Sequence, residues 1–111
     1  MAKVLISPGK YVQGAGEMKK LGEYAQNYGK KALILISKGG YKRIGAMVEK
    51  SFEGKECGYV FDYFNGECSK KEIKRLGEIV KKEACDVVIG IGGGKIFDTA
   101  KAVAYYEKTP V

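Results

Sequence analysis

The 111-residue sequence contains no histidine. Histidine is the commonest general base of enzymes and the commonest protein ligand of metals, so a reaction confined to this chain must proceed without it. The three cysteines are an odd number, and no two of them form a CxxC pair. We therefore expect Cys57, Cys68 and Cys85 to be buried or free thiols in a reducing compartment, not disulfides or metal ligands.

Long apolar segments are also missing. No stretch approaches the ~18 consecutive apolar residues of a membrane-spanning helix, and the N-terminal MAKVLISPGK lacks the apolar region of a signal peptide. We therefore expect a cytoplasmic protein with no membrane partner. Internal repeats, low-complexity tracts and linkers are absent too, which predicts a single structural unit.

Acidic residues are outnumbered, because 20 Lys and Arg against 13 Asp and Glu give a formal net charge of +7. Such an excess is found in proteins that bind nucleic acids. Here the lysines are scattered over predicted helices, and neither an RNP-type motif nor zinc-finger spacing is present. Solvated helix faces explain the charge better. We therefore expect no nucleic-acid partner, and a basic nucleic-acid binder is the weakest of the functional alternatives.

What the chain does contain is an alternation of apolar runs and segments with helical periodicity. Ala32–Ile36 is continuously apolar, as in a strand buried on both faces, and strand-like segments recur at Gly58–Phe64 and Asp86–Ile91. Helices are predicted at Glu17–Tyr28, around Tyr41 to Phe52, after the capping box Ser69–Glu72, and at Lys95–Glu107. This order predicts an α/β fold, with a mostly parallel sheet and flanking helices.

Two short strand-like stretches precede this alternation. Val4–Ser7 and Tyr11–Gly14 flank Pro8-Gly9-Lys10, a typical turn sequence. They predict an N-terminal β-hairpin.

A glycine-rich loop joins the last predicted strand to the last helix, in the sequence VIGIGGGKIFDTAKA of residues 88–102. Ligands of open α/β sheets bind beyond the carboxyl ends of the strands. Glycines let the backbone approach a ligand closely, and helix N-terminal amides favour an anion. The loop Gly90–Gly94, followed by Lys95, therefore predicts a phosphate site. The alternative is that these glycines only form a tight turn.

Two common phosphate-binding motifs fit this loop poorly. The pattern G-x-G-x-x-G aligns with Gly90 and Gly92, but Lys95 stands where its third glycine belongs. The pattern GxxxxGK[ST] fails because Ile89 and Ile96 occupy its first and last positions. The sequence therefore does not favour a kinase or a GTPase.

Three motifs together resemble one enzyme family. GIGGGKIFDTAKA is similar to the GGGKxxDxAK signature of the iron- and zinc-dependent alcohol dehydrogenase superfamily. SPGKYVQG at Ser7–Gly14 and FNGECS at Phe64–Ser69 resemble its glycerol dehydrogenase branch, which includes related polyol dehydrogenases. The three motifs occur in the order of the family, and the resemblance extends over the chain from Ser7.

The resemblance implies an incomplete Rossmann-like domain that binds NAD. It implies that Gly93, Gly94 and Lys95 bind the pyrophosphate, and that Asp98 lies near the nicotinamide side of the cofactor. Ser37 occupies the position where the family usually has an aspartate that holds the adenosine ribose. Since that position lacks a carboxylate, we expect weak discrimination between NAD and NADP.

Enzymes of this family continue into a C-terminal helical domain, where one aspartate and two histidines hold catalytic zinc or iron. The resemblance thus implies that residues 1–111 are an N-terminal NAD-binding fragment of a glycerol dehydrogenase-like oxidoreductase. It would lack the metal site and any catalytic residue, and it would be inactive alone. The complete enzyme would oxidise a polyol by hydride transfer to NAD. The alternative is a stand-alone, non-catalytic nucleotide-binding or interaction module. An exposed sheet edge would favour self-association.

Overall fold

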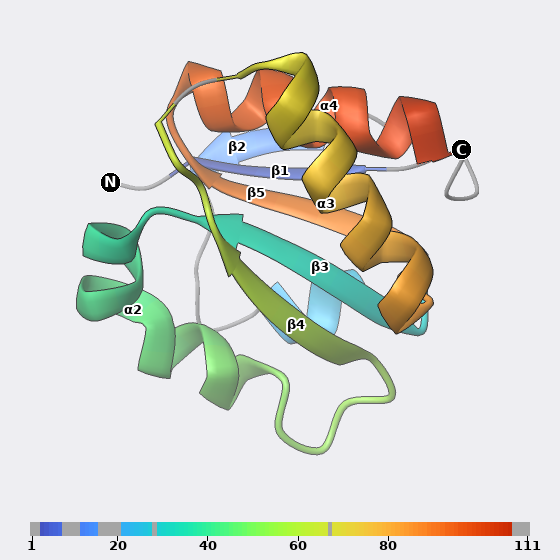
Figure 1. The fold of residues 1–111 in the computed structure, drawn as a ribbon. Helices are drawn as coiled ribbons and strands as arrows, with labels where there is room; N and C mark the ends of the chain where they lie inside the picture. The colour runs from blue at the N-terminus through green and yellow to red at the C-terminus, as the bar shows by residue number, and fades with distance from the viewer. Residues whose placement is uncertain (1–2, 8–11, 16–20, 28, 67, 108–111) are drawn as a thin grey trace.

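The computed structural model describes residues 3–7, 12–15, 21–27, 29–66 and 68–107. Its five-stranded sheet has the strand order β2-β1-β5-β3-β4, and helices cover it (Figure 1). The strands are β1 (Lys3–Ser7), β2 (Val12–Ala15), β3 (Lys31–Ile36), β4 (Gly58–Tyr63) and β5 (Val87–Gly92). The helices are α1 (Leu21–Ala25), α2 (Lys38–Ser51), α3 (Lys70–Glu83) and α4 (Gly94–Glu107).

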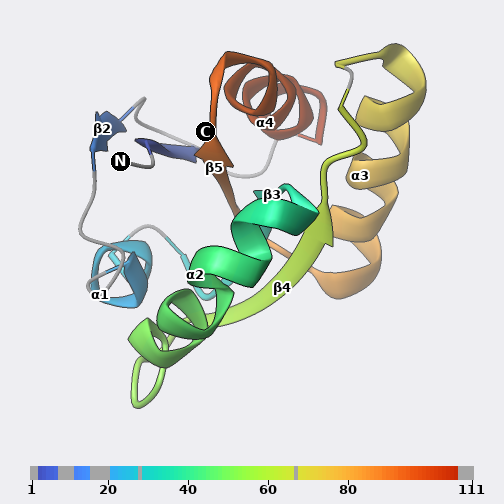
Figure 2. The ribbon, with the colours of Figure 1, turned by 90° about the vertical axis from the view of Figure 1, so that its left-hand side faces the viewer.

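The strands β5, β3 and β4 are parallel, which confirms the predicted α/β class with a parallel sheet and flanking helices. In the central strand, Ile34 pairs with Ile89 of β5 on one side and with Phe61 of β4 on the other. Helix α2 connects β3 to β4, and α3 then carries the chain back across β3 to β5. Right-handed crossovers in opposite directions place their helices on opposite faces of a sheet, as Figure 2 shows.

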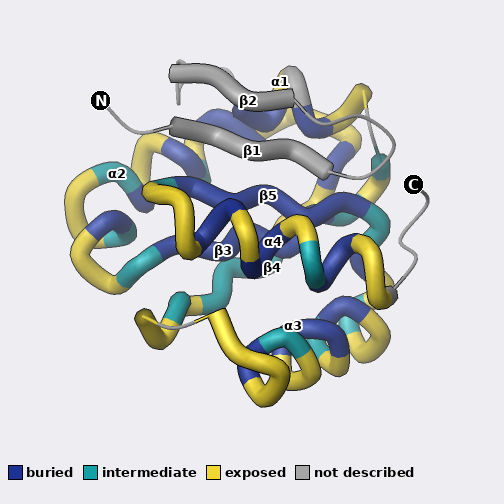
Figure 3. The backbone as a smooth tube through the Cα atoms, turned by 90° about the horizontal axis from the view of Figure 1, so that it is seen from above, coloured by how far each residue is buried: buried dark blue, intermediate teal, exposed yellow. Residues whose placement is uncertain are grey.

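Alternate residues of β3 build the two halves of the core. Ala32, Ile34 and Ile36 pack with α1 and α2, whereas Leu33 and Leu35 pack with α3 and α4. All five residues are fully buried, as the dark blue tube of β3 shows in Figure 3. This segment is continuously apolar because helices cover both faces of the sheet.

Serine side chains cap the two connecting helices. The Ser37 hydroxyl accepts a hydrogen bond from the Gly40 amide at 3.0 Å, at the start of α2. The Ser69 hydroxyl accepts one from the Glu72 amide at 3.1 Å, at the start of α3. Each bond satisfies an amide that the first helical turn leaves without a partner. The predicted helix start at Ser69 is therefore confirmed.

The N-terminal strands extend the sheet beyond β5. Strand β1 is antiparallel to both its neighbours, so that Leu5 lies opposite Gln13 of β2 and Gly90 of β5. Residues 8–11 lie outside the described residues, so the hairpin turn stays a prediction. Residues 17–20 and 28 of the expected first helix lie outside them too.

Three further findings concern the cysteines, membrane-spanning helices and the edges of the sheet. Cys57 and Cys85 are buried and Cys68 is exposed, and all three are free thiols. No helix within the described ranges is both long and apolar enough to cross a bilayer. The described sheet ends at β2 and β4, and self-association through such an edge stays a prediction.

Candidate functional site

Strands β3 and β5 lie side by side, but the chain leaves them toward opposite faces of the sheet. Strand β3 leads into α2 on one face, and β5 leads into α4 on the other (Figure 2). Such a divergence opens a crevice at the carboxyl ends of the strands, where open α/β sheets bind ligands. A cavity of about 420 Å³ lies there. Its lining comprises Ile36, Ser37, Gly40, Arg43, Ile44, Ile91 and Gly92.

Two glycines of the β5–α4 loop are explained by the protein's own packing. A Cβ atom on Gly90 would lie 3.2 Å from the Cβ of Ala100, so glycine lets α4 pack closely on β5. Gly92 has a φ of +144°, a conformation that residues with a side chain rarely adopt. A Cβ atom there would also lie 2.7 Å from Cδ1 of Ile96. The backbone conformation at Gly92 and the close packing at Gly90 therefore explain these two glycines without a ligand.

The next two glycines have no such explanation. A Cβ atom on Gly93 or Gly94 would meet no heavy atom within 4 Å, and neither residue has a positive φ. Glycine at these positions costs backbone entropy without a compensating contact in the described structure. The open space lies at the start of α4, where the first amides have no partner within the helix. This arrangement can accept an anion that approaches the backbone closely.

Lys95 and Asp98 are exposed on the first turns of α4. The carbonyl of Lys95 accepts a hydrogen bond of 2.8 Å from the hydroxyl of Thr99, which is buried. Neither Lys95 nor Asp98 is among the residues lining the cavity. Their contacts with pyrophosphate and nicotinamide therefore stay predictions.

Ser37 lines the cavity from the carboxyl end of β3, beside the strand that precedes the glycine loop. Its hydroxyl accepts the Gly40 amide, so the side chain also holds the start of α2. The structure thus brings Ser37 and Gly92 to one cavity, although 54 residues separate them in the sequence. A ligand that fills the cavity would contact the loops after both strands.

Arg43 is a residue of the cavity that the sequence analysis missed. It is exposed on α2, and its guanidinium extends back toward the helix start, because a Cβ atom on Gly39 would lie 3.4 Å from Nη1. The part of the chain that the structure describes offers Arg43 no ion pair or hydrogen bond. The available signal was the helical spacing of Gly39, Gly40 and Arg43, which places them on one face.

Lys38 does not line this cavity. Its ammonium lies 5.9 Å from the centre of the Tyr63 ring, within the range of a cation–π contact. With Asp62 and Arg75, it lines a different cavity of about 570 Å³ at the end of β4. The cation that faces the end of β3 is therefore Arg43.

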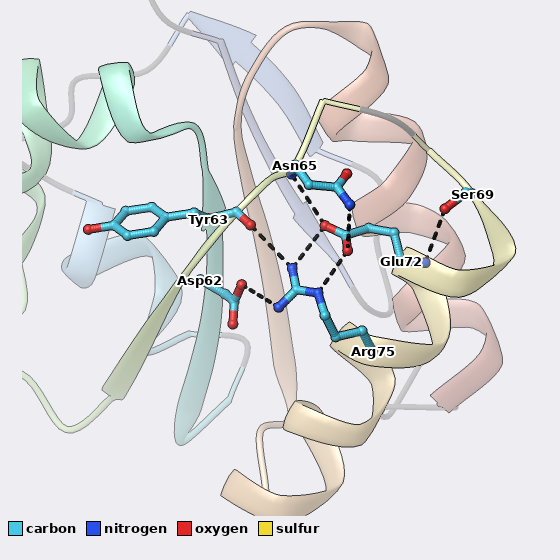
Figure 4. Close-up of polar contacts among 6 residues, drawn as sticks. All are labelled: Asp62, Tyr63, Asn65, Ser69, Glu72 and Arg75. Atoms are coloured by element: carbon cyan, nitrogen blue, oxygen red, sulfur yellow. Dashed lines mark hydrogen bonds and ion pairs between the residues drawn. The ribbon is translucent and has the colours of Figure 1, made fainter.

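A buried carboxylate organises the loop between β4 and α3 (Figure 4). Glu72 is only 2% exposed, and Arg75 donates to its carboxylate from Nε at 2.8 Å. Arg75 also donates to Asp62 at 2.9 Å and to the Tyr63 carbonyl at 3.2 Å. Asn65 donates to Glu72 through its backbone and its side chain. These hydrogen bonds connect the end of β4 and the β4–α3 loop to the first turns of α3.

The charges of this cluster stabilise one another. The hydrogen bond from Arg75 lowers the pKa of Glu72, although burial opposes that shift. The Glu72 carboxylate raises the pKa of Arg75 in turn. Glu72 is therefore ionised at neutral pH, and its charge is used within the protein. Asn65 and Ser69 of the motif at Phe64–Ser69 thus have a structural explanation.

The described residues contain no group of three or more His, Cys, Asp or Glu side chains that could hold a metal ion. Two carboxylates of β4 and α2 are used within the protein: Asp62 binds Arg75, and Glu49 accepts the Tyr41 hydroxyl at 2.8 Å. The chemistry that this region supports is recognition of an anionic ligand by backbone amides and cations.

Comparisons with known proteins agree with these motifs. The model of a family described as iron-containing alcohol dehydrogenase matches residues 8–110. The chain is 45% identical to the glycerol dehydrogenase of Thermotoga maritima and 41% identical to that of Citrobacter freundii, and each alignment covers 100% of this chain. A crystal structure of a probable glycerol dehydrogenase from Sinorhizobium meliloti is similar, with a TM-score of 0.69, 32% identity and coverage of 84% of this chain.

The matches cover only part of the larger proteins. The chain spans 30% of the length of the two curated relatives and 24% of the Sinorhizobium chain. The family model nevertheless matches almost every residue of this chain. On that match, together with the glycine loop at the end of β5, the chain belongs to the iron-containing alcohol dehydrogenase family.

Proposed function

We propose that this chain is the N-terminal, dinucleotide-binding part of a glycerol dehydrogenase-like oxidoreductase, beginning with the predicted hairpin. The dinucleotide, NAD or NADP, would bind at the carboxyl ends of β3 and β5. The observation that carries this proposal is the open space at Gly93 and Gly94, which no described atom of the protein uses. A pyrophosphate fits such a space because it needs close backbone approach and amide donors.

Each predicted residue has a place in this proposal. Gly93 and Gly94 would let the pyrophosphate reach the first amides of α4, and the Lys95 ammonium would offset its charge. Asp98, one turn further along α4, would face the nicotinamide half. The adenosine half would extend into the cavity between Gly92 and Ser37.

The chemical step is assigned to the complete enzyme. There, the bound dinucleotide would accept a hydride from a polyol, as the names of the glycerol dehydrogenase relatives suggest. The described residues do not fit the zinc or iron that the family implies, so we derive no step through a metal. The part of this chain is to bind the dinucleotide and fix its orientation.

Titration with NADH and, in parallel, NADPH tests the proposal through nicotinamide fluorescence. At least one of them should bind, and Gly94→Val should weaken that binding about tenfold or more, because the side chain fills the pyrophosphate space. The matched control is Gly58→Val, since Gly58 is also exposed but lies at the opposite end of a parallel strand. Circular dichroism would verify that both variants fold. Equal affinity of Gly94→Val and the unmodified chain would remove the loop from the site.

A further inference from the structure

The cavity at the end of β3 has a charge pattern that bears on which dinucleotide binds. In α/β dinucleotide sites, a carboxylate at the end of the strand beside the glycine loop accepts the 2′-hydroxyl of the adenosine ribose in NAD. An arginine there accommodates the 2′-phosphate of NADP instead. The two cofactors thus require side chains of opposite charge at the same place.

No carboxylate is among the described residues that line this cavity, and Arg43 is their charged member. The carboxylate of Asp62 is bound by Arg75, and that of Glu49 by Tyr41. Ser37, where an acidic residue would stand, offers a small neutral hydroxyl. An NAD ribose would find no anionic acceptor in this cavity, whereas a phosphate would find a cation.

The position of the guanidinium adds to this preference. Nη1 of Arg43 is 3.4 Å from the position that a Cβ atom on Gly39 would occupy, so the group lies over the first turn of α2. The Gly40 amide is bound to Ser37, but the amides before it have no partner within the helix. A phosphate in the cavity would therefore meet both the guanidinium and the positive end of α2.

Resting on the dinucleotide site proposed above, we infer that this cavity receives the 2′-phosphate of NADP(H), with Arg43 as the residue that determines the preference. Lys38 has no part in it, because its ammonium lies over Tyr63 and lines the other cavity. The weak discrimination expected from the sequence thus becomes a preference for NADP(H).

The test compares NADPH with NADH on the 111-residue chain and its variants. The unmodified chain should bind NADPH about tenfold or more tightly than NADH. Arg43→Gln should lose most of that difference by weakening NADPH alone. Lys42→Gln removes the same charge from the neighbouring residue, which is exposed and does not line the cavity, and should change neither affinity.

A second variant reverses the charge of the site. Ser37→Asp keeps a good helix cap and places a carboxylate in the cavity, so NADPH should weaken at least tenfold while NADH does not weaken. As a smaller probe, 2′,5′-ADP should compete for the site at lower concentration than 5′-ADP. Both measurements report on the 2′-phosphate and not on the rest of the dinucleotide.

The outcomes separate the two proposals. If neither NADH nor NADPH binds, the dinucleotide site itself is wrong, and the 2′-phosphate assignment falls with it. If NADH binds as tightly as NADPH or more tightly, the dinucleotide site stands and the assignment is overturned. The assignment is also overturned if Arg43→Gln weakens both cofactors equally.

Discussion

The β4–α3 loop and the β5–α4 loop leave the same edge of the sheet, and both contain motifs that resemble one dehydrogenase family. In the β4–α3 loop, the side chains of Asn65 and Ser69 are bound by α3. In the β5–α4 loop, Gly93 and Gly94 leave space that no described atom fills. Asn65 and Ser69 thus have a structural role in the described protein, whereas the ligand role of Gly93 and Gly94 is the proposal made above.

The largest expected effect is a loss of stability when the hydrogen bonds of the β4–α3 loop are removed. Arg75→Ala should lower the free energy of unfolding by about 3 kcal/mol, because it leaves the buried Glu72 carboxylate without its partner. Urea denaturation measures the change, and Lys71→Ala, an exposed lysine of the same helix, is the control. Among variants that remain folded, dinucleotide affinity should be nearly unchanged. A stability within 0.5 kcal/mol of the unmodified chain, roughly the effect of an ordinary surface substitution, would contradict this role.

A second prediction compares the effects on stability of substituting two glycines of the β5–α4 loop. Gly90→Val should cost about 2 kcal/mol of stability, because the added atoms collide with Ala100 and Ile96. Gly93→Ala should leave stability within about 0.5 kcal/mol, since its Cβ meets only open space. Thermal or urea unfolding compares them. If both variants are equally destabilised, the division into folding and ligand-binding glycines is wrong.

A third prediction concerns pH. Arg75 holds the pKa of Glu72 below its ordinary value of 4.5 in the folded protein. Folding therefore favours the ionised carboxylate, and its contribution to stability is complete above pH 4.5 and decreases as the pH falls through the lowered pKa. Urea unfolding between about pH 3 and 7 should show a smaller acid loss of stability in Glu72→Gln. Parallel pH profiles would show that this carboxylate does not titrate as described.

The smallest effect concerns the thiols. Burial raises the pKa of Cys57 and of Cys85 to about 11, so at pH 8 both remain protonated and shielded. Cys68, exposed in the β4–α3 loop, should react with a thiol reagent much faster. A reaction time course should therefore show one fast thiol, which Cys68→Ser removes. Three equally fast thiols would mean that the two cores open readily.

Much of the fold follows from local pattern. The uninterrupted apolar run at Ala32–Ile36 indicates a strand covered on both faces, and the helix start at Ser69 follows from its capping residues. The pairing of β1 with β5 could not be predicted in this way, because it joins segments more than 80 residues apart in sequence. Periodicity shows that a segment is a strand, but not which strands are its neighbours.

For the candidate site, too, the sequence predicted the general location but not the roles of individual residues. Three consecutive glycines before a helix indicate close approach of a ligand, but only three-dimensional packing separates Gly90 and Gly92 from the two that follow. Judged by sequence adjacency alone, Lys38 would be the cation next to the cavity, since it directly follows Ser37. In the structure, Arg43, one turn further along α2, lines the cavity, whereas the Lys38 ammonium lies over the Tyr63 ring.

The divergence of the chain at β3 and β5 has an evolutionary consequence. The helix that contains Arg43 is packed in one half of the core, and the helix that follows the glycine loop is packed in the other. In the proposed dinucleotide site, substitutions on α2 would thus alter which cofactor is accepted while the packing that supports the glycine loop is preserved. Cofactor preference would then change by few mutations, independently of the ability to bind a dinucleotide at all.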